Sequence, residues 1–385
     1  MKWPLAAAHT RAGIADALAT ITPALLTPGR SRPPATVLRA ALYGHAFNPS
    51  RADADPGPAA GSALAWARCH SMPLAALAGP AVTRCALDAL ALRLDGTRAA
   101  AATITRKRAV FHDCLSYAAE LGFLEANPLD RITWRPPRSP GSAGPRSAAT
   151  PAEVEAILAE VTQIHPELTA FFGCLYYAAL RPAEAVVLRA RSCILPSRGW
   201  GQLTLTGSLP RSARAWTGNG TPRESRGLKH RPEGAIRTVP IPPQLARLLR
   251  WHLRAFGCAA DGRLFRGARG GPLSESLYGR TWHQARAAAA MPGPGRLRPY
   301  DLRHAALSLW LASGAPPAPG TACVSCSPST PTAYPAATRS LATTSTGPCT
   351  PAPAHRWPTK AVPTRPDPVR HASVPQLDAT RHSWT

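Results

Sequence analysis

The stretch RPYDLRH at residues 298–304, read together with LRPAE at residues 180–184, decides how this chain is interpreted. Each stretch places an arginine at the edge of an expected helix, Arg181 in one and Arg303 in the other. A guanidinium group holds its charge at physiological pH and binds phosphate oxygens through paired hydrogen bonds. Two arginines from distant parts of the sequence are therefore candidates for a single phosphate-binding site.

The charge of the chain indicates a polyanionic partner. Its 385 residues include 45 Lys and Arg against 21 Asp and Glu, which gives a net charge of +24. This excess exceeds what solubility requires and favours nucleic acid binding. The other interpretation, which composition leaves open, is solvated arginine from a GC-rich genome. We find no apolar run long enough to span a bilayer and no signal peptide, so we expect a cytoplasmic protein without a membrane partner.

The nine cysteines do not predict a metal site. Most lie in apolar helical patterns, where a free cysteine behaves as a small hydrophobic residue, and this favours a reducing, cytoplasmic environment. Cys323 and Cys326 have the spacing of half a zinc site, which Cys349 and His355 could complete. Zinc ligands come from short ordered turns, and the gap here is long and proline-rich, so we expect no metal. A zinc-dependent nucleic-acid module is kept as an alternative.

Composition and periodicity divide the chain into five regions and predict a mainly α (α+β) fold with a small antiparallel hairpin or sheet. A weakly ordered basic arm is expected first, with one short helix, followed by a helical domain, a linker, a larger domain and a disordered tail. Their bounds are 1–60, 61–134, 135–149, 150–315 and 316–385.

The helical domain carries a basic cluster, Arg106, Lys107 and Arg108, just before the apolar run of its second helix. Basic residues gathered at one end of a helical bundle are typical of a DNA-binding surface, and a solvated charged turn is the alternative interpretation.

The larger domain begins at Thr150-Pro-Ala-Glu153, a helix-capping sequence. A helical segment at 165–190 should break before Pro182, which leaves Arg181 at a helix boundary. Strands are expected at 202–206, and at 227–229 and 236–241 as a hairpin with Lys229 at its base. Three further helices are expected at 243–256, 274–290 and 300–312.

Arg181, Lys229 and Arg303 form a set suited to one reaction class. A phosphodiester under nucleophilic attack gains charge on its non-bridging oxygens, and two arginines with a lysine can stabilise that charge without a metal. Taken singly, each has a simpler interpretation: Arg181 could cap a helix, Lys229 could be a surface lysine, and Arg303 could pair with Asp301 or Glu184.

The order of LRPAEAVVL at 180, GLKHRPEGAIRTVPIP at 227 and RPYDLRHAALSLWLASG at 298 resembles the catalytic domain of the tyrosine recombinase (phage integrase) family. The resemblance covers about residues 150–314, and residues 81–131 resemble the family's helical core-binding domain. It implies that Arg181 and Arg303 are the two catalytic arginines and Lys229 the hairpin lysine. Tyr300 stands where the family usually has a histidine, and a phenol can also donate a hydrogen bond to phosphate.

The same resemblance implies double-stranded DNA as the partner, assembly as a tetramer on DNA, no cofactor, no metal and a nucleoid location. We expect Arg106, Lys107, Arg108 and His304 to contact DNA. The family's mechanism joins a tyrosine covalently to a DNA phosphate and conserves the bond energy for rejoining.

The tail lacks the family's last two elements, a Gly-His step and a helix-borne tyrosine nucleophile. Its one tyrosine, Tyr334, precedes Pro335. We hypothesise a shifted reading frame, because codons for residues 319–327 can be rebuilt in the neighbouring frame to give Ala-Gly-His-Ser-Val-Arg-Val-Leu-Leu. We therefore expect an integrase-type protein that binds DNA without cleaving it, with a non-catalytic DNA-binding protein or a type IB topoisomerase-like enzyme as alternatives.

Overall fold

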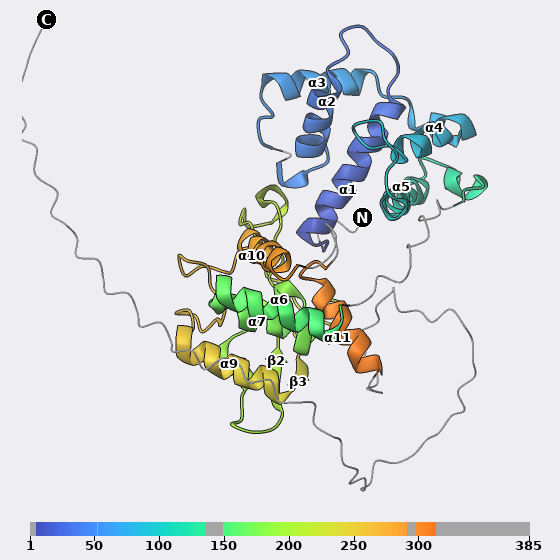
Figure 1. The fold of residues 1–385 in the computed structure, drawn as a ribbon. Coiled ribbons are helices and arrows are strands. Elements are labelled where there is room, and N and C mark those ends of the chain that lie inside the picture. Colours follow the sequence, from blue (N-terminus) through green and yellow to red (C-terminus); the bar gives the residue numbers. More distant parts are fainter. Residues whose placement is uncertain (1–4, 52, 136–148, 291–296, 313–385) are drawn as a thin grey trace, which may run out of the picture. The chain divides into compact units, whose positions relative to one another are not determined.

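The protein is described here by a computed structural model that covers residues 5–51, 53–135, 149–290 and 297–312 (Figure 1). This part of the chain is mainly helical with one small antiparallel sheet, which confirms the predicted fold class. The predictions made for the tail, namely its frame shift, its lack of a nucleophile and its lack of a metal site, concern residues outside the described ranges. The predicted linker at 135–149 also lies outside the described residues, except for its first and last residue.

The N-terminal sixty residues differ from the weakly ordered arm that composition predicts. They contain α1 (Ala8–Ile21), α2 (Ala35–Ala41) and the start of α3 (Pro58–Cys69). The one short helix that we expected in this arm corresponds to α2. The reason for the difference is that α1 is buried mainly through alanines, such as Ala15 and Ala19, and small side chains give little amphipathic signal in a sequence.

Two further helices follow, as the periodicity predicts. They are α4 (Pro80–Leu90) and α5 (Ala101–Glu120), and both contact α1. Leu87, Leu90, Phe111 and Leu115 form a shared core, whereas Leu94 lies beyond the end of α4 and is exposed. The buried stripe of α4 therefore ends at Leu90.

The described residues from 149 onward are built around one buried helix. Its helices are α6 (Pro151–Ile164), α7 (Pro166–Tyr177), α8 (Pro182–Ala185), α9 (Pro243–Phe256), α10 (Glu275–Ala288) and α11 (Asp301–Ala312). Every residue from Leu168 to Tyr176 is buried, because α7 packs against α6, α9 and α11 (Figure 1). Thr150 and Glu153 form the predicted capping box at the start of α6.

The sheet has three antiparallel strands in the order β1 (Cys193–Ile194), β2 (Gly201–Leu205) and β3 (Arg237–Ile241). The strand expected at 227–229 is wrong, and β3 pairs with β2 instead. This pairing buries Leu203, Leu205, Val239 and Ile241 in one core, whereas residues 227–229 offer only Leu228.

Short helices connect these elements, and one of them makes a long-range contact. The short helices are η1 (Thr22–Leu25), η2 (Leu42–Ala46), η3 (Pro49–Arg51), η4 (Leu74–Ala78), η5 (Pro128–Arg131), η6 (Ala190–Ser192) and η7 (Arg214–Trp216). Trp216 on η7 is buried with Ala8 and Ala15 of α1, and its ring lies 5.0 Å from that of Tyr43. Asn48 also donates a hydrogen bond to the Ala215 carbonyl, at 2.9 Å.

Candidate functional site

Arg181 is held at the start of α8 by a buried carboxylate. Its backbone is extended because a proline follows it, as predicted. Glu184, which is buried, accepts two hydrogen bonds from Arg181: one from the backbone N–H to Oε2 at 2.9 Å, and one from Nη1 to Oε1 at 2.8 Å. The Arg181 side chain stays 19% exposed, so part of the guanidinium can meet a ligand.

A second arginine, Arg237, reaches the same carboxylate from the start of β3. Its Nη2 donates to Glu184 Oε2 at 2.9 Å, and its Nε is buried without a hydrogen-bond partner. Burial lowers the pKa of Arg237, and the Glu184 carboxylate opposes that shift. Arg237 was not among the site residues predicted from the sequence. Its position directly before the alternating stretch Thr238–Ile241 is the signal that could have identified it.

Arg303 completes a cluster of three guanidinium groups. It lies on α11, is only 3% exposed, and donates a hydrogen bond from Nη1 to the Ala179 carbonyl. Burial lowers its pKa, and the positive charge of Arg181 lowers it further, while Glu184 acts in the opposite direction. Three guanidiniums around one carboxylate leave an excess of two positive charges, which favours an anion. We call Arg181, Arg237, Arg303 and Glu184 the arginine cluster.

The arginine cluster borders an open cleft. A cavity of about 220 Å³ is lined by Ala178, Ala179, Arg231, Ile236, Arg237, Thr238, Val239, Pro240 and Trp310. Arg237 belongs to both the cluster and the cleft, and the Ala179 carbonyl that binds Arg303 comes from a lining residue. An anion therefore has space beside the cluster.

Tyr300 and His304 lie next to each other at the start of α11. Their rings meet edge to face at 5.2 Å between centroids, and Tyr300 is 41% exposed. Tyr300 is close enough to act electrostatically on Arg303. Asp301 accepts a hydrogen bond from the Arg298 backbone N–H at 2.7 Å and so fixes the turn into α11.

Lys229 is placed differently from the hairpin lysine that we expected. It lies in a turn between β2 and β3, is exposed, and precedes His230, whose φ of 60° is left-handed. Within the described ranges, no hydrogen bond or ion pair joins Lys229 to the arginine cluster. The third cation that the fold brings to Arg181 and Arg303 is Arg237.

The basic cluster on α5 is divided between the interior and the surface. Arg106 is exposed, but Lys107 is buried, with Nζ 2.8 Å from Thr20 Oγ1 and 3.0 Å from Asp16 Oδ2. Arg108 lies over the Trp134 ring, 4.5 Å from its centroid. Burial acts to raise the pKa of Asp16, but Lys107 and Arg39 outweigh it and lower that pKa. The ammonium group of Lys107 is thus used to join α1 to α5.

The described residues contain no group of His, Cys, Asp and Glu side chains that could hold a metal ion. Among the same residues, no helix is long and apolar enough to cross a membrane. Cys323, Cys326, Cys349 and His355 lie outside the part of the chain that the structure describes.

Comparison with known proteins defines the fold. No family model matches the chain, and no curated protein matches it. Two solved structures of the Tn1549 transposon integrase in complex with circular intermediate DNA have TM-scores of 0.52 and 0.51, with 16% and 17% identity. Each covers 73% of this chain and 88% of the integrase chain. A lambda integrase dimer bound to a COC' core site has a TM-score of 0.43 and 14% identity, over 69% of this chain and 87% of the other.

The chain therefore has an integrase-type fold. More particularly, its described helices and small sheet follow the fold of the Tn1549 transposon integrase. This agrees with the fold that the resemblance to tyrosine recombinases implied. At these identities the likeness concerns the fold alone.

Proposed function

We propose that this protein binds double-stranded DNA and holds one backbone phosphate at the arginine cluster, in the manner of a tyrosine recombinase. The observation that carries the proposal is that Arg181 and Arg237 both bond to Glu184, with Arg303 close enough for its charge to act on all three. Such preorganised guanidiniums stabilise the charge that develops on a phosphodiester under attack, and they need no metal for it. The solved integrases with this fold are themselves complexes with DNA, which supports the same partner.

The exposed phenol of Tyr300 extends this site. It lies beside Arg303, where it can donate a hydrogen bond to a non-bridging phosphate oxygen. We propose that Lys229 also joins the site when DNA binds. It lies in the β2–β3 connection, which we expect to close on bound DNA. Arg106, Arg108 and His304 are proposed to contact the backbone, whereas Lys107 supports α5 from inside.

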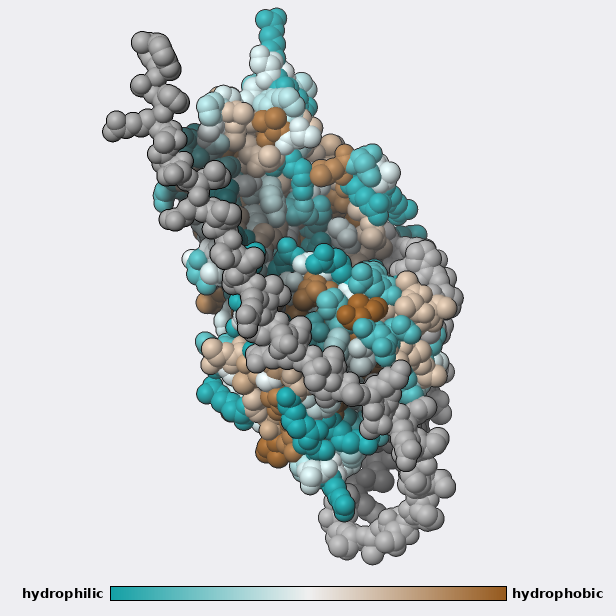
Figure 2. Space-filling view, turned by 60° about the vertical axis from the view of Figure 1, so that its left-hand side comes forward, coloured by the Kyte–Doolittle hydropathy of each residue, from teal (hydrophilic) through white to brown (hydrophobic). Residues whose placement is uncertain are grey.

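The surface is compatible with a long polyanion. On the face shown in Figure 2, hydrophilic residues cover most of the described surface, and hydrophobic residues form small separate patches. With a net charge of +24, affinity should fall steeply as salt rises. We also propose a cytoplasmic, nucleoid-associated location and assembly into a tetramer on DNA, both from the resemblance to tyrosine recombinases.

We propose further that this chain does not cleave DNA, because the sequence after Gly314 has no Gly-His step, and its one tyrosine, Tyr334, directly precedes a proline. The test uses a pool of duplexes that have randomised core sequences and a nick in one strand. Cleavage beside the nick would release a short fragment, so the strand could not be rejoined and any covalent protein–DNA intermediate would accumulate. We expect no protein–DNA adduct. An adduct that survives boiling in detergent would show that the chain is an active recombinase. Nucleotide sequencing across codons 310–340 tests the frame-shift hypothesis separately.

Binding at the arginine cluster is tested by duplex affinity. We expect Arg181→Gln and Arg237→Gln each to weaken binding of a 30-base-pair duplex by about tenfold, since charge-assisted bonds contribute about 1.5–3 kcal/mol each. Arg254→Gln, an exposed arginine on α9, is the matched control and should bind like wild type. Equal affinities for all four proteins would contradict the proposed site. Failure of wild type to bind any duplex would contradict the proposed partner.

A further inference from the structure

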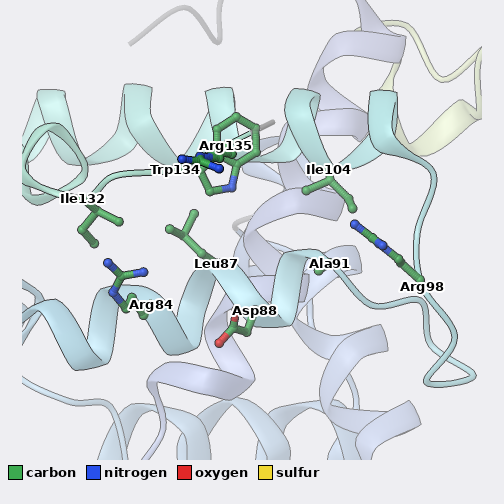
Figure 3. A pocket seen from close by; sticks show the side chains of 9 residues that line it. All are labelled: Arg84, Leu87, Asp88, Ala91, Arg98, Ile104, Ile132, Trp134 and Arg135. Carbon is green, nitrogen blue, oxygen red and sulfur yellow. The ribbon is translucent and has the colours of Figure 1, made fainter. Parts of the chain in front are cut away.

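A second pocket opens in the helical region before residue 136 (Figure 3). Its volume is about 220 Å³, and it lies between α4, α5 and the segment that follows η5. It is lined by Arg84, Leu87, Asp88, Ala91, Arg98, Ile104, Ile132, Trp134 and Arg135. None of these residues belongs to the arginine cluster.

The inner wall of the pocket is apolar and aromatic. Leu87, Ile104 and Ile132 are nearly buried and belong to the packed interior. Trp134 is partly exposed, and Arg108 lies over its ring at 4.5 Å. The guanidinium keeps the indole in place, so the ring offers a prepared surface for a flat ligand.

The rim of the pocket is strongly positive. Arg84, Arg98 and Arg135 are exposed, and Asp88 is the one carboxylate in the lining. Figure 3 shows Arg84 and Arg98 at opposite ends of the pocket, with Leu87 and Trp134 between them. A ligand that fits this distribution has a flat apolar centre and a negative charge on each side.

We propose that this pocket binds a single unpaired nucleotide of a DNA strand. Each nucleotide within a strand has a flat base between two phosphates, which matches an apolar centre flanked by arginines. Any base can stack on an aromatic ring, so the site would not select one sequence. A paired base cannot enter, because both of its faces are covered within the duplex. The proposal rests on the proposed DNA binding and adds a preference for unpaired nucleotides to it.

The test compares two labelled duplexes that differ only in one unpaired nucleotide. The full chain is titrated with a fully paired duplex and with the same duplex carrying a one-nucleotide bulge, by fluorescence anisotropy. Stacking of one base on an aromatic ring corresponds to a gain of about fivefold to 150-fold in affinity. We therefore expect the wild-type protein to bind the bulged duplex at least about fivefold more tightly.

Two pocket variants and two matched controls locate the effect. Trp134→Leu should abolish the bulge preference, and Arg84→Gln, at an exposed position, should reduce it without affecting folding. Trp66→Leu is the control for the ring, because Trp66 also has an arginine over it, Arg32 at 5.9 Å, but lies on α3. Arg68→Gln, exposed on α3, is the control for the charge, and both controls should keep the preference.

The outcomes separate this proposal from the proposed function. Equal binding of the two duplexes by the wild-type protein, or a preference that survives Trp134→Leu and Arg84→Gln, overturns the pocket proposal alone. The proposal is also overturned if an acidic peptide displaces DNA from the wild-type protein but not from the two pocket variants, because the pocket would then bind a protein partner. If the paired duplex does not bind but the bulged one does, the pocket proposal stands and the phosphate site of the proposed function fails.

Discussion

Glu184→Gln is the substitution that probes the arginine cluster most sharply. The side chain keeps its shape but loses its charge, and one of its oxygens becomes an NH2 group that faces guanidinium donors. Glu184 is buried and bonds to Arg181 at 2.8 Å and to Arg237 at 2.9 Å. Removal of one partner from a buried ion pair costs about 3–5 kcal/mol. Because the amide retains one acceptor, we expect the free energy of unfolding to fall by about 3 kcal/mol.

The matched control is Glu153→Gln. Glu153 also stands at the third position of a helix and accepts a hydrogen bond from the backbone N–H of the preceding cap residue, Thr150, at 2.7 Å. No arginine contact is described for it. Because glutamine can also accept the capping hydrogen bond, its replacement measures only the loss of a charge at a helix start, which is worth about 0.3–1 kcal/mol. Urea unfolding of the two variants is the assay, and equal losses in both would refute the view that Glu184 is held by two arginines.

Sulfate gives the experiment a second readout. Without the Glu184 charge, three guanidiniums face each other, and a bound dianion should relieve their repulsion. We expect 50 mM sodium sulfate to raise the melting temperature of Glu184→Gln more than that of wild type, with sodium chloride at equal ionic strength as the control. An equal response to the two salts would show that the cluster does not bind an anion.

Four further outcomes follow from the same structure. Lys107→Met should lower the free energy of unfolding by about 2 kcal/mol, because it removes the charge-assisted bonds of Lys107 to Asp16 and Thr20. Arg106→Gln should leave the free energy of unfolding unchanged but reduce the salt slope of duplex binding by about one. Trp216→Ala should cost about 3–5 kcal/mol, measured by urea unfolding, because the side chain is 2% exposed within its cluster. Since the pKa of Asp16 is lowered on folding, its contribution to stability is present above its ordinary pKa of 3.8 and is lost as the pH falls below that value. Wild type but not Asp16→Asn should therefore lose that contribution below about pH 4, with Asp53→Asn as an exposed control. Arg303→Lys should weaken duplex binding, because a lysine cannot bond to the Ala179 carbonyl and reach a phosphate together, and a duplex titration that shows unchanged affinity would contradict this.

Local signals in the sequence were sufficient to predict many of the helix bounds after residue 149. The stripe at 243–256 predicts α9 with its observed bounds, since a leucine at every third or fourth position allows only one buried face. The cap at Thr150 and the break before Pro182 also depend on neighbouring residues alone, and both are confirmed. The position of Arg181 at a helix boundary was predictable for the same reason.

Features that depend on distant pairing were not predictable in this way. The choice of β2 as the partner of β3 depends on the shared core of Leu203 and Val239, which lie far apart in the sequence. Arg237 enters the site only through that pairing. Lys107 looked like part of a basic surface because Asp16, its partner, is in a segment whose alanine-rich helix gives a weak signal.

The most direct measurement of the central claim is the salt dependence of duplex binding by the double variant Arg181→Gln/Arg237→Gln. The logarithm of affinity is plotted against the logarithm of salt concentration for this protein, for wild type and for the control pair Arg250→Gln/Arg254→Gln on α9. If the arginine cluster holds a DNA phosphate, the double variant should lose about one unit of slope, while the control pair keeps the wild-type value. An unchanged slope in the double variant would contradict the account.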